Sequence, residues 1–383
     1  MANTIKLGNG NWATKEGSLL AYNDENNNFK PLPFTTTRAS SATVVNKQGL
    51  IETVGSGIPR IDFSDDANGA LLLEPTSKNI ITYSEDFSNV SWTKTGSSIV
   101  TPNTMISPDG TLNADSFTFT TSTSDKIQQF ATVVALAEYT ISCYIKSDSN
   151  IIIKIGGAAA STPINVTTEW VRHTVTQTNG AGTAAFPQLG SNGTAGTVYI
   201  YGAQLEENSY STSYIKNEGT AAGVTRVADT ASGSGNSTVI NSTEGVLYAE
   251  ISALANDGTN RFISLTNGVT DATSISLAFT TTINQIRALV DIGYSLQASI
   301  THTVSSVLDF NKVAFSFKEN DFALWINGVK VGTDPNGSVP PASYLSDLGF
   351  LRVNALSFYG KCKDSRVYTT VLSDAELISL TTI

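Results

Sequence analysis

The chain is poor in the residue types that carry most protein chemistry. Its 383 residues include 2 cysteines, 2 histidines and 2 methionines, and charged residues make up only 15% of it. Two cysteines cannot make a disulfide framework. Cys143 and Cys362 each stand inside an expected strand, so buried free thiols are favoured over a bridge between them. Neither has the neighbours of a zinc site or of a Cys-His nucleophile.

Histidine offers no catalytic base. His173 and His302 each stand in a strand-like pattern with apolar residues two positions away on both sides. A histidine in this setting is more often a half-buried strand residue than a base. A Ser-His-Asp triad also needs a third group that orients the histidine, and nothing in the sequence supplies it. No catalytic residue is therefore assigned.

Acidic residues occur as adjacent pairs at Asp65-Asp66, Glu85-Asp86 and Glu206-Glu207. Glycoside hydrolysis needs two carboxylates that face each other, roughly 5 to 9 Å apart. Neighbours in a strand point to opposite faces, and neighbours in a loop usually face water, so solvated turns are expected. Residues 245–383 also lack the Glu-x-Asp-x-x-Glu strand motif of glucanases with a lectin fold. We expect a protein that is not an enzyme.

Positive charge and long apolar runs are also lacking. The chain has 23 Lys and Arg against 33 Asp and Glu, for a net charge of −10. With no basic run, nucleic acid and anionic membranes are unfavourable partners. No window approaches 18 consecutive apolar residues, so no membrane-spanning helix is expected. Met1–Lys6 has no apolar core of a signal peptide, so no secretion is expected.

Metal ligands are sparse. Calcium takes roughly six to eight oxygen ligands from converging loops. Asn256, Asp257 and Asp271 lie in expected loops, but no Asp-x-Asp-x-Asp run is present. We assign no metal site and no cofactor, and a structural calcium ion stays open as an alternative.

What the chain does have is the pattern of an all-β protein. Short alternating segments are separated by turns rich in Gly, Asn and Ser, which is typical of β-sandwiches. Tyr139, Ile141, Cys143 and Ile145 would share one face of a strand. Further strands are expected at 116–120, 151–155, 169–175 and 196–202. These segments predict an antiparallel sandwich over residues 79–217.

A second sandwich is expected over residues 245–383. Asn327-Gly328 is a strong signal for a type I′ hairpin turn. Ser373 and Glu376 form the pattern of a capping box, which predicts a short terminal helix. Residues 218–244 are rich in Gly and Ser and are expected to be a linker.

Residues 1–78 lack a clear periodic core. A hairpin is plausible at 43–51, with its turn at 46–49. The apolar run Leu71–Leu73 needs burial on both faces, and Pro75 ends it because proline cannot donate to a ladder. We expect this segment to pack on the next domain or on another subunit, since it can hardly bury enough surface alone.

Exposed aromatic rings are the natural platform for sugars, since a flat apolar ring matches the C–H face of a pyranose. Trp92, Trp170 and Trp325 are the large candidates, and core packing is the simpler expectation for each. Trp325 is the preferred ligand-binding residue. Phe322, Leu324 and Ile326 would share one face of its strand, and Trp325 would point to the other.

Several motifs resemble those of bacteriophage virion proteins. In the first part of the chain these are Arg38–Thr43 (Arg-Ala-Ser-Ser-Ala-Thr), Pro59–Ile61, Leu71–Pro75 and Tyr83–Phe87. Tyr201–Glu206, Thr212–Ile215 and Thr225–Asp229 continue the pattern and are similar to a carbohydrate-binding-module-like jelly roll. Residues 366–377, with Arg-Val-Tyr and Leu-Ser-Asp-Ala-Glu, resemble the concanavalin A-like lectin (laminin-G-like) fold.

The resemblance implies a tail or head fibre or receptor-binding adhesin. Residues 1–78 would be the virion-attachment or oligomerisation segment, 79–217 the jelly roll, 218–244 the linker and 245–383 the lectin-like sandwich. The implied function is non-catalytic binding of host-surface or environmental glycans by a homotrimer that assembles with other virion proteins. The protein would be made in the host cytoplasm. Two alternatives remain, a polysaccharide depolymerase tailspike and a purely structural capsid decoration protein.

Overall fold

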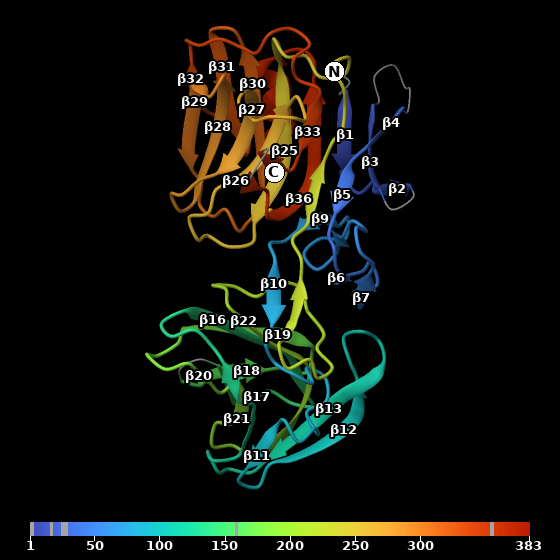
Figure 1. Cartoon of the computed structure of the whole chain (residues 1–383), viewed down its shortest axis with the longest axis vertical. Helices are drawn as coiled ribbons and strands as arrows, with labels where there is room; N and C mark the ends of the chain where they lie inside the picture. The colour runs from blue at the N-terminus through green and yellow to red at the C-terminus, as the bar shows by residue number, and fades with distance from the viewer. Residues whose placement is uncertain (1–3, 16–17, 24–29, 158–159, 353–355) are drawn as a thin grey trace. The chain divides into compact units, whose positions relative to one another are not determined.

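The structure is a computed structural model that describes residues 4–15, 18–23, 30–157, 160–352 and 356–383. Within these residues it consists of β-strands and a single α-helix, which confirms the all-β fold class (Figure 1). The chain forms two compact units. The first comprises residues 1–39, 56–75 and 228–383, and the second comprises residues 40–55 and 76–227.

The larger sheet of the first unit joins strands from both ends of the chain. In it β1 (Ile5–Gly8) pairs antiparallel with β36 (Gly360–Tyr368), so that Ile5 lies opposite Val367 (Figure 1). The sheet continues through β25 (Glu244–Ala253), β30 (Asn311–Lys318), β31 (Asp321–Ile326) and β32 (Val329–Asp334). Its other strands are β2 (Ala13–Lys15), β3 (Ser18–Asn23), β4 (Lys30–Pro33), β8 (Ile61–Asp62) and β9 (Ala70–Leu73).

A second sheet completes this sandwich. Its order is β29 (Ser295–Thr303), β28 (Gln285–Ile292), β27 (Ser274–Phe279), β26 (Arg261–Thr266) and β33 (Asp347–Gly349), with all pairs antiparallel. The inward side chains of both sheets form one core, which includes Leu247, Ile263, Leu277, Phe315 and Leu324. Short pairs are β5 (Thr35–Thr37) with β24 (Thr230–Ser232) and β34 (Leu351–Arg352) with β35 (Leu356–Ser357).

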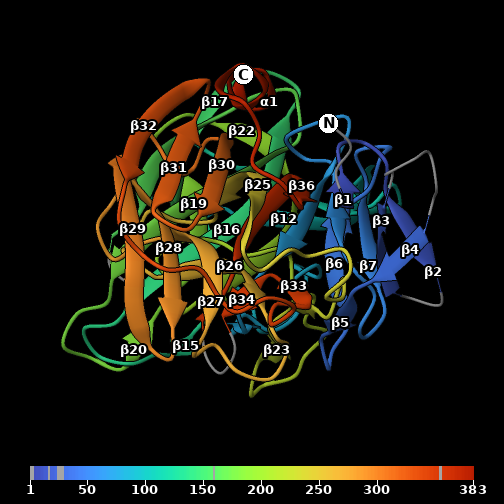
Figure 2. The same ribbon diagram turned by 90° about the horizontal axis from the view of Figure 1, so that it is seen from above.

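The single helix in the described residues, α1 (Asp374–Thr381), begins with the expected capping box. The Ser373 side chain accepts from the Glu376 backbone N–H, and the Glu376 carboxylate accepts from the Ser373 backbone N–H. The helix covers the outer face of β25, β30 and β31 (Figure 2). The turn between β31 and β32 is also as expected, because Asn327 and Gly328 have φ of 50° and 83°, the positive values that a type I′ turn requires.

The second unit contains two antiparallel five-stranded sheets. One has the order β11 (Thr93–Thr95), β14 (Lys126–Gln128), β21 (Gln188–Ser191), β17 (Ile151–Gly156) and β18 (Thr162–Val166). The other has β12 (Ile99–Ile106), β13 (Leu112–Phe119), β22 (Gly196–Glu206), β16 (Glu138–Ser147) and β19 (Val171–Thr178). The expected face of Tyr139, Ile141, Cys143 and Ile145 is buried in the core between them.

Three short strand pairs complete the second unit. The hairpin expected near residues 43–51 is present as β6 (Ala42–Val45) and β7 (Ile51–Val54), with Gly49 at a φ of 79° in its turn. The strand β10 (Ser77–Asn79) pairs with β23 (Val224–Arg226). Finally, β15 (Ala131–Thr132) pairs with β20 (Ala184–Ala185).

The units combine segments that the sequence boundaries placed in separate domains. Residues 1–39 and 56–75 belong to the first unit, whereas 40–55 belong to the second. The region 218–244 contributes β23 to the second unit and β24 to the first unit. Leu71–Leu73 lie in β9 with at most 4% of their surface exposed, and the chain leaves the first unit at Pro75, as a buried strand ended by proline predicts.

Candidate carbohydrate-binding site

Two exposed phenylalanines flank the short pair β15–β20 in the second unit. Ala131 lies opposite Ala185 in the register, so Phe130 and Phe186 are placed opposite each other at the end of the pair. Their ring centroids are 5.9 Å apart at an interplanar angle of 69°. The Phe130 side chain is 65% exposed and Phe186 is 45% exposed. Two large aromatic rings exposed side by side form an apolar patch, and such patches are common at binding sites.

Backbone hydrogen bonds hold this pair in place. The Gln129 N–H donates to the Pro187 carbonyl at 3.0 Å, and the Phe186 N–H donates to the Gly157 carbonyl at 3.0 Å. The Gln129 amide is anchored in turn, since its carbonyl oxygen accepts from the Thr82 N–H and its amide group donates to the Thr82 carbonyl. The rings therefore stand on a defined backbone, which preorganises them for a ligand.

A hollow of about 870 Å³ lies beside Phe130. This volume is within the usual range for a small-molecule site. The hollow combines apolar and polar side chains from several segments of the second unit. Its lining residues include Thr76, Lys78, Ile80, Thr82, Gln129, Phe130, Thr132, Val134, Tyr139, Glu207, Asn208 and Thr225.

Polar groups in the wall are fixed by hydrogen bonds. The Tyr139 hydroxyl accepts from the Val134 N–H at 2.8 Å and donates to the Glu207 carboxylate at 3.1 Å. Burial and the nearby Glu207 carboxylate raise the pKa of Tyr139 above its ordinary value, so the hydroxyl keeps its proton at neutral pH. Asn208 donates to the Ser77 hydroxyl at 2.8 Å. The site thus offers aromatic surface next to positioned acceptors and hydroxyls.

The outer face of the β12–β19 sheet is filled by the chain's own side chains. Tyr144, Tyr201 and Tyr214 pack there together with Met105 and Trp170. Trp170 is half-buried, and its indole N–H donates to the Ile106 carbonyl at 3.0 Å. This face therefore offers less open aromatic surface than the Phe130 hollow.

The expected exposure of Trp325 is wrong. The side chain is 3% exposed and packs with Tyr248, Ala314 and Leu377 beneath α1. The amino group of Lys330 lies 5.0 Å from the centre of its ring. Strand alternation placed Trp325 correctly on the face opposite Phe322, but that face is covered by the terminal helix. Trp92 is also buried, at 1% exposure, as core packing predicts.

Sequence reasoning missed Phe130 and Phe186. Each stands in a short irregular segment, between Gln129 and Ala131 and between Ala185 and Pro187. Neither segment has the alternation that marks a strand, so no face could be assigned. The available signal was a large aromatic side chain among small and polar residues outside any expected strand.

The residues considered for catalysis and metal binding have other roles. His173 is half-buried opposite Cys143, and burial lowers its pKa. The Asp257 carboxylate receives two hydrogen bonds from Arg261, and Asp271 pairs with Arg352. In the described parts of the chain no three His, Cys, Asp or Glu residues are grouped as a metal site would require. Among those residues, no α-helix has the length and apolar character that a membrane crossing requires.

A second, polar hollow of about 440 Å³ lies on the first unit. Glu250 and Asp364 are direct neighbours on adjacent strands and both line it. Burial raises the pKa of both carboxyls. However, Asp364 is 3% exposed and both of its oxygens accept hydrogen bonds from Arg366. A carboxylate held in this way is poorly placed to transfer protons to a sugar, so the pair does not support hydrolysis.

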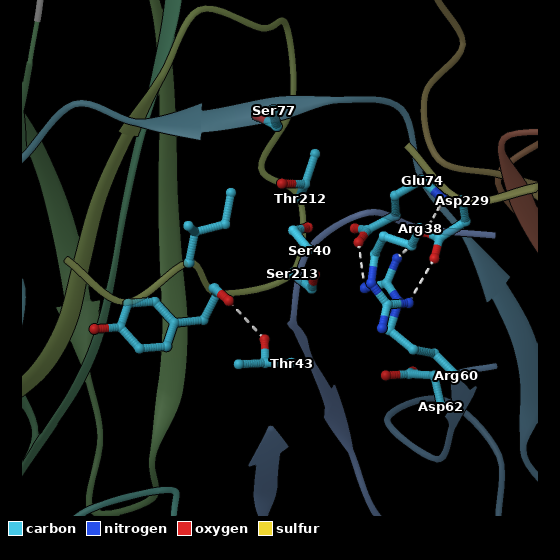
Figure 3. A network of polar contacts seen from close by, with 12 residues as sticks. Arg38, Ser40, Thr43, Arg60, Asp62, Glu74, Ser77, Thr212, Ser213 and Asp229 are labelled. Atoms are coloured by element: carbon cyan, nitrogen blue, oxygen red, sulfur yellow. Dashed lines mark hydrogen bonds and ion pairs between the residues drawn. The ribbon is translucent and has the colours of Figure 1, made fainter. Parts of the chain in front are cut away.

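The charged residues of four sequence motifs meet in one buried cluster of the first unit (Figure 3). Arg60 pairs with Glu74 at 2.6 Å and with Asp229, and Arg38 pairs with Asp229 at 2.8 Å. All four side chains are at most 6% exposed. These four side chains are closed to solvent and bound to one another, so their role is structural.

Comparison with protein-family models finds no match, and comparison with curated proteins finds none either. Solved structures with similar folds include the CBM40 of a Ruminococcus gnavus sialidase bound to α2,3-sialyllactose, with 18% identity and a TM-score of 0.33. That match covers 39% of this chain and 93% of the module. Domain 4 of AbnA, an arabinanase from Geobacillus stearothermophilus, in complex with arabinotriose, has 13% identity and a TM-score of 0.31, covering 44% and 84%.

A CBM4 structure has 16% identity and a TM-score of 0.25, covering 43% of this chain and 99% of that one. The proteins that these structures represent are carbohydrate-binding modules or parts of sugar-degrading enzymes. The protein is an all-β chain of two sandwich units.

Proposed function

We propose that the chain is a non-catalytic glycan-binding protein whose binding site is the Phe130 hollow. The exposed edge-to-face pair of Phe130 and Phe186 is the observation that carries the proposal. The C–H face of a pyranose would stack on these rings. Its hydroxyls would donate hydrogen bonds to the Glu207 carboxylate and would exchange hydrogen bonds with Thr132 and Asn208. Of the described residues that line the hollow, Glu207 is the one carboxylate. Glycoside hydrolysis by a pair of carboxyl groups would need a second carboxylate in the hollow.

The biological setting that fits the motif resemblance is a bacteriophage virion. In this proposal the protein is a tail or head fibre or adhesin that binds host-surface or environmental glycans and assembles with other virion proteins as a homotrimer. Protein–sugar contacts are usually weak, so several copies on one particle would supply the useful strength through avidity. A cryo-EM map of particles carrying the protein would test its location and symmetry.

A glycan array probed with the purified full-length chain tests the binding function. Phe130→Ala and Phe186→Ala should each weaken binding to the strongest array ligand by at least about tenfold, or ~1.4 kcal/mol. Both side chains are solvent-exposed, so the melting temperature should change little. Tyr294→Ala is the matched control, because Tyr294 is 70% exposed and lies in the first unit. If glycan binding were unchanged in both phenylalanine variants, the assignment of the binding site to the Phe130 hollow would be wrong.

A further inference from the structure

The hollow carries almost no charge. Among the described residues that line it, Lys78 and Glu207 are charged, one of each sign, and none is an arginine. Both charged side chains are solvent-exposed. The remaining polar groups are hydroxyls and amides, which include Thr76, Thr132, Thr225 and Asn208. Hydroxyls both donate and accept hydrogen bonds, and amides offer one group of each kind, so they complement the neutral hydroxyls of a sugar.

A sugar that bears a carboxylate would find poor partners here. Carboxylate recognition is strongest with the planar, bidentate fork of an arginine, whereas an exposed lysine is a strongly hydrated point charge. The Glu207 carboxylate is held at the wall by the Tyr139 hydroxyl at 3.1 Å. It would repel a second carboxylate in the hollow. The net charge of −10 on the whole chain also repels polyanions at longer range.

We infer that the hollow selects neutral pyranosides and discriminates against uronic and sialic acids, an inference that rests on the glycan-binding function proposed above. The Phe130 and Phe186 rings supply the affinity through stacking. Glu207 supplies the selectivity, since it accepts hydrogen bonds from neutral hydroxyls and repels anionic groups. This assignment gives the ligand class of the site.

The test uses immobilised oligosaccharides in matched pairs that differ only at C6, glucose against glucuronic acid and galactose against galacturonic acid. The purified full-length chain should bind the neutral member of a pair at least about tenfold more tightly. Its affinity should change by less than about twofold when salt rises from about 0.05 to about 0.5 M, because salt screens charge–charge attraction and not stacking.

Glu207→Gln isolates the selectivity, because glutamine keeps an oxygen acceptor for the Tyr139 hydroxyl and removes the charge. Affinity for the neutral sugar should fall, since Glu207 is one of the groups that bind its hydroxyls, while the ratio of uronic to neutral affinity should rise at least about threefold. The selectivity would be overturned if the natural chain bound the uronic member as tightly as the neutral member, or more tightly. If Phe130→Ala abolished that binding, the glycan-binding function of the hollow would still stand. Failure to bind any glycan on the array would overturn the proposed function and the selectivity with it.

Discussion

Arg60 and Asp229, 169 residues apart in the sequence, form a buried ion pair in the first unit. Glu74 holds the other side of the Arg60 guanidinium at 2.6 Å, and its own backbone N–H donates to Asp229 at 3.0 Å. Burial alone would lower the pKa of Arg60, but the Glu74 and Asp229 carboxylates outweigh it and raise that pKa. Each charge in the cluster is therefore tolerated only because its partners are present.

We expect Asp229→Asn to destabilise the first unit by about 3–5 kcal/mol, since it removes the charge of a carboxylate that binds two buried guanidinium groups. Urea unfolding of the full-length chain, followed by tryptophan fluorescence, measures the change. Lys318→Ala is the control, because it breaks an ion pair at the surface with Glu244, which is worth about 0–1 kcal/mol. An Asp229→Asn variant as stable as that control would show that the cluster contributes little.

The cluster shows what the sequence could not predict. The chain passes between the two units at residues 39–40, 55–56, 75–76 and 227–228. Arg38, Arg60, Glu74 and Asp229 each stand close to one of these passages. The resemblance to virion proteins marked the four motifs that contain them, but contacts across such separations leave no local periodicity. Their meeting follows from the strand pairing of the whole unit.

Local features were predictable because they depend on neighbouring residues. The period-two pattern of β16, the turn at Asn327-Gly328 and the cap at Ser373 all agree with the structure. Alternation fixes which side chains share a face, but not which face is covered. That is why the exposure of Trp325 was predicted wrongly. The Phe130 and Phe186 pair was missed because its two segments meet only through the β15–β20 register.

Trp325→Ala should destabilise the first unit by roughly 3–5 kcal/mol, the usual cost of deleting a large buried aromatic side chain. Its effect should appear as a lower melting temperature in calorimetry. Glycan binding through the Phe130 hollow should persist well below the transition, because that site belongs to the second unit. An unchanged melting temperature together with lost binding would restore Trp325 as a ligand-binding residue.

Both cysteines should be unreactive in the folded protein. Burial raises the pKa of the Cys143 thiol to about 12, and it raises that of Cys362 well above the ordinary value. Only the thiolate attacks a disulfide reagent, so a chromogenic disulfide added at pH 8 should release almost no thiolate from the native chain. In the chain unfolded by guanidinium chloride, both cysteines should react with the reagent. Rapid labelling of the native protein would mean that one thiol reaches solvent.

Asp347, in β33, should make the first unit less stable as pH rises from about 4 to about 6. Burial raises its pKa to about 6, against the opposing hydrogen bond from the Gly233 backbone. An unfolded aspartate titrates near about 3.9. Between these values the folded chain binds more protons than the unfolded chain, so stability falls with rising pH and stays lower above the window. Asp347→Asn keeps an acceptor for Gly233 and removes this penalty.

Melting temperatures of the two chains from about pH 3 to about pH 8 test this linkage. We expect Asp347→Asn to gain stability over the natural sequence above about pH 6 and to lose that advantage below about pH 4.

Asp109 should show the opposite dependence of stability on pH. Burial would raise its pKa, but hydrogen bonds from Thr111, Asn113 and Ser107 lower it to about 2. Asp109→Asn should therefore cost stability above about pH 4, with the gap closing as pH falls toward about 2. If the melting temperature of each variant followed pH in parallel with that of the natural chain, the assigned burial of Asp347 and hydrogen bonding of Asp109 would be contradicted.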